Sequence, residues 1–184
     1  MKQLLLIIII GLTIAGQSYA QETADNPPTL STNLWKAHIL APGLEYERRL
    51  GDKSTLNVNP HLRLGYGYGG SFGSIWVAQP MLDIQYRQYY NLDRQHAKGK
   101  ATARNSGSFF ALSVFGATRS LIDAEGTQSQ FQYGIGPLWG MQRTYDNRLN
   151  ASLQLGGVYT RTAAGGQNVL PQIRVRLGFV LQKK

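Results

Sequence analysis

The feature that most constrains the fold of this chain is a regular alternation of apolar and polar residues over long stretches. From Leu56 to Tyr66 every second residue is aliphatic, aromatic or proline, and the residues between them are Asn, His, Arg or Gly. Successive side chains of a β-strand point to opposite faces, so this period of two predicts a strand with one apolar and one polar face.

The alternation recurs in four further stretches, at residues 76–87, 131–142, 149–159 and 172–182. Residues 108–118 are apolar on both faces and predict a strand whose register the pattern leaves open. Residues 33–50 are too long for one strand, and Ala41-Pro42-Gly43 divides them into strands at 33–40 and 44–50. No window has a helical period. The pattern therefore predicts an all-β chain of eight strands.

The connections between these strands have an order of their own. Residues 51–54 and 145–148 are short polar turns, whereas longer connections lie at 67–73, 91–107, 119–129 and 161–169. With the N-terminus in the periplasm, the tight turns fall on the periplasmic side and three of the four long loops fall outside, as in outer-membrane barrels. We therefore expect an eight-stranded antiparallel up-and-down transmembrane β-barrel over residues 33–184, with 91–107 as a periplasmic exception.

The first residues predict export. Lys2 precedes the apolar run from Leu4 to Ala15, and Ser18-Tyr19-Ala20 follows it as a cleavage site, so residues 1–20 are expected to be a signal peptide. The alternative, an N-terminal membrane anchor, is disfavoured by the shortness of the run. Residues 21–32 are polar, contain Pro27-Pro28, and predict an extended periplasmic lead-in.

Composition separates classes of membrane protein. Only 16% of the residues are charged, against about 25% in a typical soluble domain, yet the mean hydropathy is −0.25. A single apolar stretch excludes a helical protein with several spans, each of which needs about 20 apolar residues. A soluble eight-stranded barrel with its apolar face inward is the alternative.

Three features favour the membrane barrel over the soluble one. The polar face is rich in glycine, which leaves room in a narrow lumen, and the middle of the apolar face carries no charge. Aromatic residues lie at both ends of the strands, as in interfacial girdles: Tyr66, Tyr68, Trp76, Phe131 and Tyr159 at the outer rim, and Tyr86, Tyr89, Tyr90, Phe110, Tyr145 and Phe179 at the inner one.

Several short motifs carry a family resemblance. They are Leu44 to Lys53 (LEYERRLGDK), Tyr89 to Arg94 (YYNLDR), Lys98-Gly99-Lys100 and Asn105-Ser106-Gly107. Together with the leader they make the chain resemble the small, mostly uncharacterised outer-membrane β-barrel proteins of the Bacteroidetes. The resemblance covers essentially the whole mature chain and implies fold and location, namely a barrel in a bacterial outer membrane, but no reaction.

Ionisable residues gather on the predicted lumen face. The expected ionic network comprises Glu45, Glu47, His61, Arg63, Asp83, Arg174 and Arg176, drawn from a wider set that also holds Lys36, His38 and Arg87. Such a network would fill an eight-stranded interior, which is just wide enough for side chains. The catalytic alternative, His38 or His61 with a glutamate and a serine, lacks any nucleophile motif.

No metal or cofactor is expected. His38, His61 and His96 lie far apart in the sequence without paired-ligand spacing, and the chain has no cysteine. The run from Gly65 to Gly73 leaves a strand and precedes no helix, which predicts an outer loop rather than a phosphate loop.

The basic periplasmic segment 91–107 carries Arg94, Lys98, Lys100 and Arg104. A solvated loop beside the membrane is one interpretation. Contact with anionic lipid headgroups, peptidoglycan or a periplasmic protein is the other. Nucleic acid is a poor partner for an exported barrel, even at a sequence pI near 9.9.

The expected role is that of a non-enzymatic outer-membrane β-barrel protein that acts structurally or through interactions, with outer-membrane lipids around it. Three alternatives stay open: a small pore, a lipid-modifying outer-membrane enzyme, and a soluble periplasmic ligand-binding barrel.

Overall fold

The computed structural model of the chain describes residues 28–69, 73–121, 130–146 and 148–181, and the side chains of 65–69 and 73–77 are left aside. The expected signal peptide and most of the expected lead-in therefore lie outside the described residues. None of the helices described is both long and apolar enough to cross a membrane.

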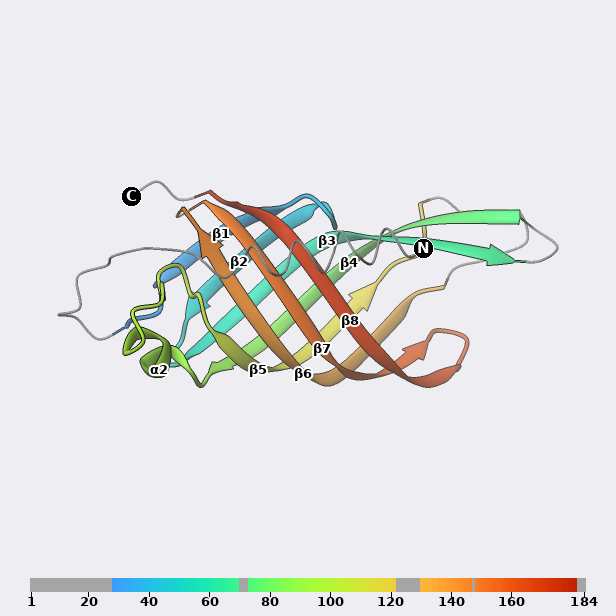
Figure 1. Ribbon diagram of the computed structural model, residues 1–184. Helices are drawn as coiled ribbons and strands as arrows, with labels where there is room; N and C mark the ends of the chain where they lie inside the picture. The colour runs from blue at the N-terminus through green and yellow to red at the C-terminus, as the bar shows by residue number, and fades with distance from the viewer. Residues whose placement is uncertain (1–27, 70–72, 122–129, 147, 182–184) are drawn as a thin grey trace.

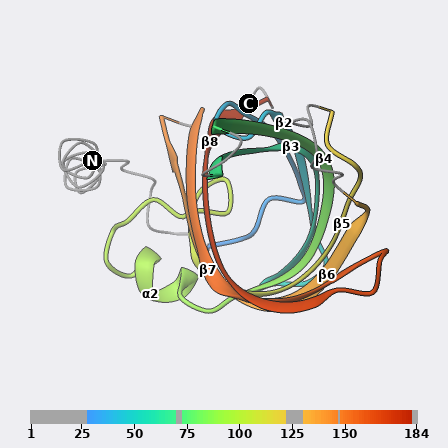
Figure 2. The same cartoon turned by 90° about the vertical axis from the view of Figure 1, so that its right-hand side faces the viewer.

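The chain forms one sheet of eight antiparallel strands. The strands are β1 (Asn33–His38), β2 (Gly43–Arg49), β3 (Ser54–Gly69), β4 (Gly73–Tyr89), β5 (Ser108–Ala117), β6 (Gln132–Tyr145), β7 (Leu149–Thr162) and β8 (Gln167–Val180). Each pairs with the next in up-and-down order, and β1 also pairs with β8, so the sheet closes into a barrel (Figures 1 and 2). The all-β, eight-strand prediction is confirmed.

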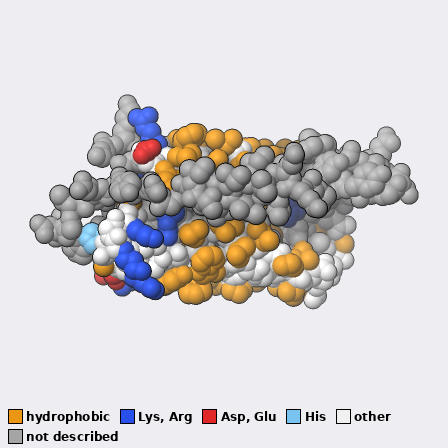
Figure 3. All heavy atoms as spheres, in the orientation of Figure 1, with side chains coloured by type: hydrophobic (Ala, Val, Ile, Leu, Met, Phe, Trp, Pro, Cys, Tyr) orange, Lys and Arg blue, Asp and Glu red, His pale blue; other side chains and the backbone are white. Residues whose placement is uncertain are grey.

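The two faces of the sheet are those that the alternation predicts. On β4, Asp83 and Gln85 are buried inside, whereas Leu82, Ile84 and Tyr86 are exposed outside. The closed ring thus has an interior that holds the buried polar and charged side chains together with an apolar cluster, and an outer surface that is apolar. Hydrophobic side chains cover the middle of the visible wall in Figure 3.

Several element bounds differ from the predicted ones. The first strand ends at His38 rather than Leu40, because residues 39–42 form the turn of a short hairpin. The last strand begins at Gln167, so much of the loop expected at 161–169 is paired strand. The segment expected as a long loop at 91–107 contains a one-turn helix, α2 (Leu92–His96), which has too few residues for a hydrophobic period to be read.

The structure sets the register of β5, which its apolar sequence left open. Phe109 and Phe115 point inward and are buried, opposite Gly140 and Gly134 of β6. A Cβ atom at Gly140 would lie 2.4 Å from the Phe109 ring, and one at Gly134 would lie 2.7 Å from the Phe115 ring. Glycines on the interior face of β6 therefore make room for two phenyl rings.

The barrel has two unlike ends. The α2 end holds α2, the turns at 50–53 and 146–148, the start of β1 and the end of β8. The far end holds the other four connections, and there the β3–β4 and β7–β8 hairpins extend well beyond the β1–β2 hairpin (Figure 1).

Candidate functional site

The candidate site is the charged interior of the barrel. On the β1–β2 side, Lys36 Nζ lies 2.7 Å from Glu45 Oε1 and 2.9 Å from Glu47 Oε2. Arg87 Nη1, from β4, lies 3.1 Å and 3.4 Å from the same two oxygens. All four side chains are buried, and Tyr89 adds a hydroxyl that donates to Glu47 Oε1 over 2.7 Å. Two carboxylates are thus neutralised by two cations.

A second group centres on Asp83. Its Oδ2 atom lies 2.6 Å from Arg174 Nη1 and 3.0 Å from Arg176 Nη2, and Ser113 donates to its Oδ1 atom over 2.6 Å. Arg176 Nη1 also lies 3.2 Å from Glu45 Oε2, so one guanidinium joins the two groups. We call these seven side chains the ion network: Lys36, Glu45, Glu47, Asp83, Arg87, Arg174 and Arg176.

The ion network crosses the lumen from wall to wall. β4 and β8 are four strands apart in the ring of eight and so face each other, yet Asp83 of β4 touches two arginines of β8. Lys36 of β1 likewise donates to Gln142 of β6 over 2.7 Å. Side chains that meet across the centre fill the interior at this level. Their desolvation costs free energy, and their mutual ion pairs and hydrogen bonds recover part of that cost.

Five of the seven residues predicted for the network lie in it: Glu45, Glu47, Asp83, Arg174 and Arg176. Lys36 and Arg87 complete it. Their inward position on alternating strands was visible in the sequence, but the register that brings them to the glutamates was not.

The prediction is wrong for His61 and Arg63, which have no carboxylate within ion-pair distance in the described part of the chain. Arg63 donates to the side-chain carbonyl oxygens of Gln79 and Gln132, and His61 Nδ1 donates to the Asn59 carbonyl oxygen over 3.1 Å. Both lie on the part of β3 that runs toward the far end of the barrel.

The histidines have structural contacts. His38 Nε2 lies 2.9 Å from Glu45 Oε2, and the buried Ser113 donates to Asp83 rather than to a histidine. His96 belongs to α2, at the end of the barrel. Among the residues described, no group of three or more His, Asp or Glu side chains is placed to hold a metal ion.

The α2 end of the lumen is covered by backbone from two segments. Residues 28–32 run across the ring seen end-on in Figure 2, and Leu30 is buried in a core cluster with Tyr89, Leu92 and Phe109. The Ser31 amide donates to Asn105 Oδ1 over 2.7 Å. Asn105 is itself fully buried. The lead-in and the end of the 91–107 segment therefore form a cap on this end.

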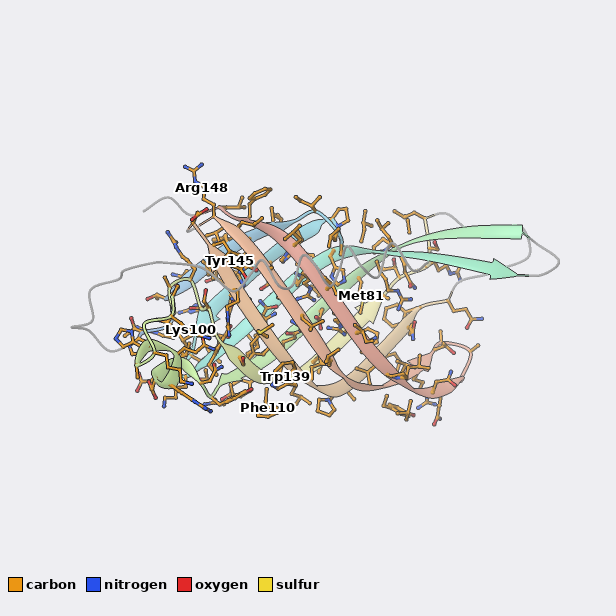
Figure 4. The ribbon with its side chains drawn as sticks, in the orientation of Figure 1. Met81, Lys100, Phe110, Trp139, Tyr145 and Arg148 are labelled. Atoms are coloured by element: carbon orange, nitrogen blue, oxygen red, sulfur yellow. The ribbon has the colours of Figure 1, made fainter. Side chains whose placement is uncertain are left out.

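The basic segment divides into two parts. Residues 105–107 are buried against β6, where the Thr144 amide donates to Ser106 Oγ over 2.9 Å, so the solvated-loop interpretation is wrong for this part. Arg94, Lys98 and Lys100 are exposed, and Arg104 is half-buried with φ of 55°. Figure 3 shows Lys and Arg side chains gathered at this end, and Figure 4 labels Lys100 and Arg148 there.

The far end of the interior contains a pocket of about 330 Å³. It lies between β3 and β8, next to the turn of the β1–β2 hairpin. Met81 of β4, labelled in Figure 4, lines it on the lumen side. We call it the side pocket. His61, Arg63, Arg174 and Arg176 line it, so the two residues that the ion network leaves out belong here.

Comparisons with known proteins give no relative: no family model, no curated protein and no solved structure matches this chain.

Proposed function

We propose that the chain is a transmembrane β-barrel of a bacterial outer membrane, with a filled, non-conducting lumen and a non-enzymatic structural or interaction role. The observation that carries the proposal is the inverted polarity of the wall: charges are buried inside and aliphatic side chains are exposed outside. In water that arrangement is costly on both faces, whereas in a bilayer each face meets the solvent it suits.

Strand length supports a bilayer location. β3, β4, β6, β7 and β8 have 14 to 17 residues and β5 has 10. A tilted strand needs about 9–11 residues to cross the hydrocarbon core. Six strands therefore suffice for a crossing, and the longest project beyond it.

Outward aromatic side chains support the same location. Toward the α2 end, Tyr90 stacks on Phe110 with ring centroids 5.1 Å apart, and Trp139 Nε1 donates to the Tyr90 hydroxyl over 2.8 Å. Figure 4 labels Phe110 and Trp139 in this half of the wall. Phe131 and Tyr159 are exposed toward the far end. Amphipathic rings at two levels suit the two membrane interfaces.

One correction applies to the predicted girdles. Tyr89 faces inward and is fully buried, bonded to Glu47, because it lies on the odd-numbered, interior face of β4. The side chains of Tyr66, Tyr68 and Trp76 lie outside the described residues.

The small-pore alternative is disfavoured by the ion network and the cap. The network spans the lumen, and the cap covers its α2 end.

We propose outer-membrane lipids as the surrounding partners. The exposed cations Arg94, Lys98 and Lys100 would then face anionic headgroups, peptidoglycan or a periplasmic protein. The family resemblance and the expected leader agree with this location.

Fractionation and conductance together test the proposal. We expect the protein in the outer-membrane fraction, with gel mobility that changes on heating, and we expect no channel steps in planar bilayers. Recovery in the soluble periplasm with unchanged mobility would contradict the membrane barrel. Steady conductance by the heat-modifiable form would instead contradict the filled lumen and favour the pore.

A further inference from the structure

The β1–β2 hairpin is too short for the wall it belongs to. β1 and β2 have 6 and 7 residues, fewer than the roughly 9–11 of a full crossing. Its last backbone bonds to its neighbours are Leu62 N to Pro42 O and Ile39 N to Leu177 O, each 2.8 Å. In the described part of the chain, β3 beyond Leu62 and β8 before Leu177 have no strand paired to these edges.

The side pocket lies in this gap and passes through the wall. Arg174 and Arg176 point into the lumen, whereas Ile173 and Val175 on the same strand point outward, and all four line the pocket. On the opposite side Leu64, also outward-facing and exposed, lines it. A pocket lined by both faces of one strand wraps around the edge of that strand, so it connects the lumen with the outer surface.

In the described part of the chain, positive charge exceeds negative charge in the interior beside the side pocket. Among the residues described, five cations face the interior, the four of the ion network and Arg63, against three carboxylates, which leaves an excess of two. Arg174 Nη1 holds Asp83, but Arg174 Nη2 is buried with no hydrogen-bond partner among the residues described. Arg63 is bonded to amide side chains alone among the residues described. A buried guanidinium N–H without an acceptor is costly, and an anion would supply the acceptor.

We propose that the side pocket binds the phosphate headgroup of an anionic membrane lipid that enters sideways through the gap between β3 and β8. The inference rests on the proposed membrane location. Arg63 and the free arm of Arg174 would hold the phosphate, while the acyl chains stay outside along Leu64, Ile173 and Val175. At about 330 Å³ the pocket accepts a headgroup but not the whole lipid.

The apolar outer half distinguishes this ligand from a free anion. Ile173 and Val175 are among the most exposed aliphatic side chains described, at 75% and 58%. A site for free phosphate needs no such surface beside it, whereas an amphiphile uses both halves at once. The charge of the inner half and the apolarity of the outer half thus fit one molecule.

Native mass spectrometry of the full chain, folded in detergent micelles, tests the proposal. The probes are dimyristoyl phosphatidic acid, phosphatidylcholine with the same chains, and inorganic phosphate. We expect one phosphatidic acid to bind saturably and phosphatidylcholine to bind at least about tenfold more weakly. Arg63→Gln should weaken phosphatidic acid binding about tenfold or more, the effect of losing one charge-assisted hydrogen bond.

Controls separate the site from general attraction to charge. Arg161→Gln removes an exposed cation of β7 at the same far end, outside the pocket, and should leave binding unchanged. Arg174→Gln should weaken binding too, but it also removes an ion-pair partner of Asp83, so Arg63→Gln is the deciding variant.

Three results would overturn the proposal: equal binding by wild type and Arg63→Gln, equal binding of both lipids, or displacement of the lipid by inorganic phosphate at equal concentration. The last would mean a free-anion site. Each measurement uses protein whose gel mobility changes on heating. These three results would therefore contradict the lipid site without contradicting the proposed membrane barrel. Absence of that mobility change would instead be a failure of the proposed function.

Discussion

The two ends of the barrel interior treat charge differently. Toward the α2 end, Glu45 and Glu47 are each matched by Lys36 and Arg87, and the cap covers the mouth. Toward the far end, Arg63 and one arm of Arg174 have no carboxylate partner among the residues described, and the pocket beside them reaches the outer surface. Paired charges fill the end near α2. Unpaired charges leave an end that can accept a ligand. Four sets of substitutions test this difference between the ends.

The largest expected effect comes from Glu45→Ala at the paired end. The substitution leaves Lys36, Arg87 and Arg176 buried without that carboxylate, which should lower the free energy of unfolding by about 3–5 kcal/mol. Urea titration of the protein folded in lipid vesicles measures it. Asp93→Ala, which breaks only the exposed pair with Lys53, should change little. Equal effects of the two substitutions would mean that the ion network is exposed to water and not buried.

A charge placed on the outer wall should have the next largest effect. Its cost at mid-wall and at the rim shows which part of the wall lies in the hydrocarbon core. Val114 lies outward at mid-wall between Ile84 and Ile135, so Val114→Arg should destabilise the vesicle-bound barrel by about 2–4 kcal/mol. Val169→Arg, near the far rim, should cost at most about 1 kcal/mol. A soluble barrel would tolerate both substitutions equally in the absence of lipid.

Overpacking the paired end should have an intermediate effect. Gly140→Ala places a methyl group 2.4 Å from the Phe109 ring, and we expect a loss of about 1–3 kcal/mol in the same urea titration. Gly157→Ala on the outward face of β7 meets nothing within 4 Å and is the matched control. If both substitutions are neutral, the glycines of β6 do not make room for the phenyl rings.

The smallest expected effect concerns the cap. Asn105→Gly removes the acceptor for the Ser31 amide without straining the positive φ of 59° and should cost about 1 kcal/mol, with faster hydrogen exchange at the amides of residues 29–32. Gln130→Ala removes a similar bond to the Ala164 amide at the far end, where the residue is exposed, and should change exchange much less. Slow exchange retained in the Asn105 variant would show that the cap is held by Leu30 instead.

Much of the wall could be predicted because its alternation is strong. The sequence predicts β3, β4, β6 and β7 to within a few residues, because apolar and polar residues alternate along most of each strand. β5 could not be given a register, because both of its faces are apolar. The start of β8 at Gln167 does not follow from the sequence, because Val169 and Leu170 break the alternation.

The interior was predictable as a set of residues but not as a set of pairs. Inward placement follows from parity alone, so Glu45, Asp83 and Arg174 could be assigned to the lumen. Which cation meets which carboxylate depends on strand stagger and on contacts across the lumen, and these are set by every pairing register together. For this reason the sequence alone does not predict the ion pairs of Lys36 and Arg87, nor that His61 and Arg63 line the side pocket.

The amino-acid sequence by itself determined the number of strands and the polarity of their two faces, because side-chain direction in a strand is a local property with a period of two. Only the tertiary structure decided that the β1–β2 hairpin is shorter than the strands beside it, that Asp83 forms ion pairs with arginines of β8, and that Arg63 lines a pocket. Those outcomes depend on how eight strands of unequal length close into one ring, and no single strand contains that information.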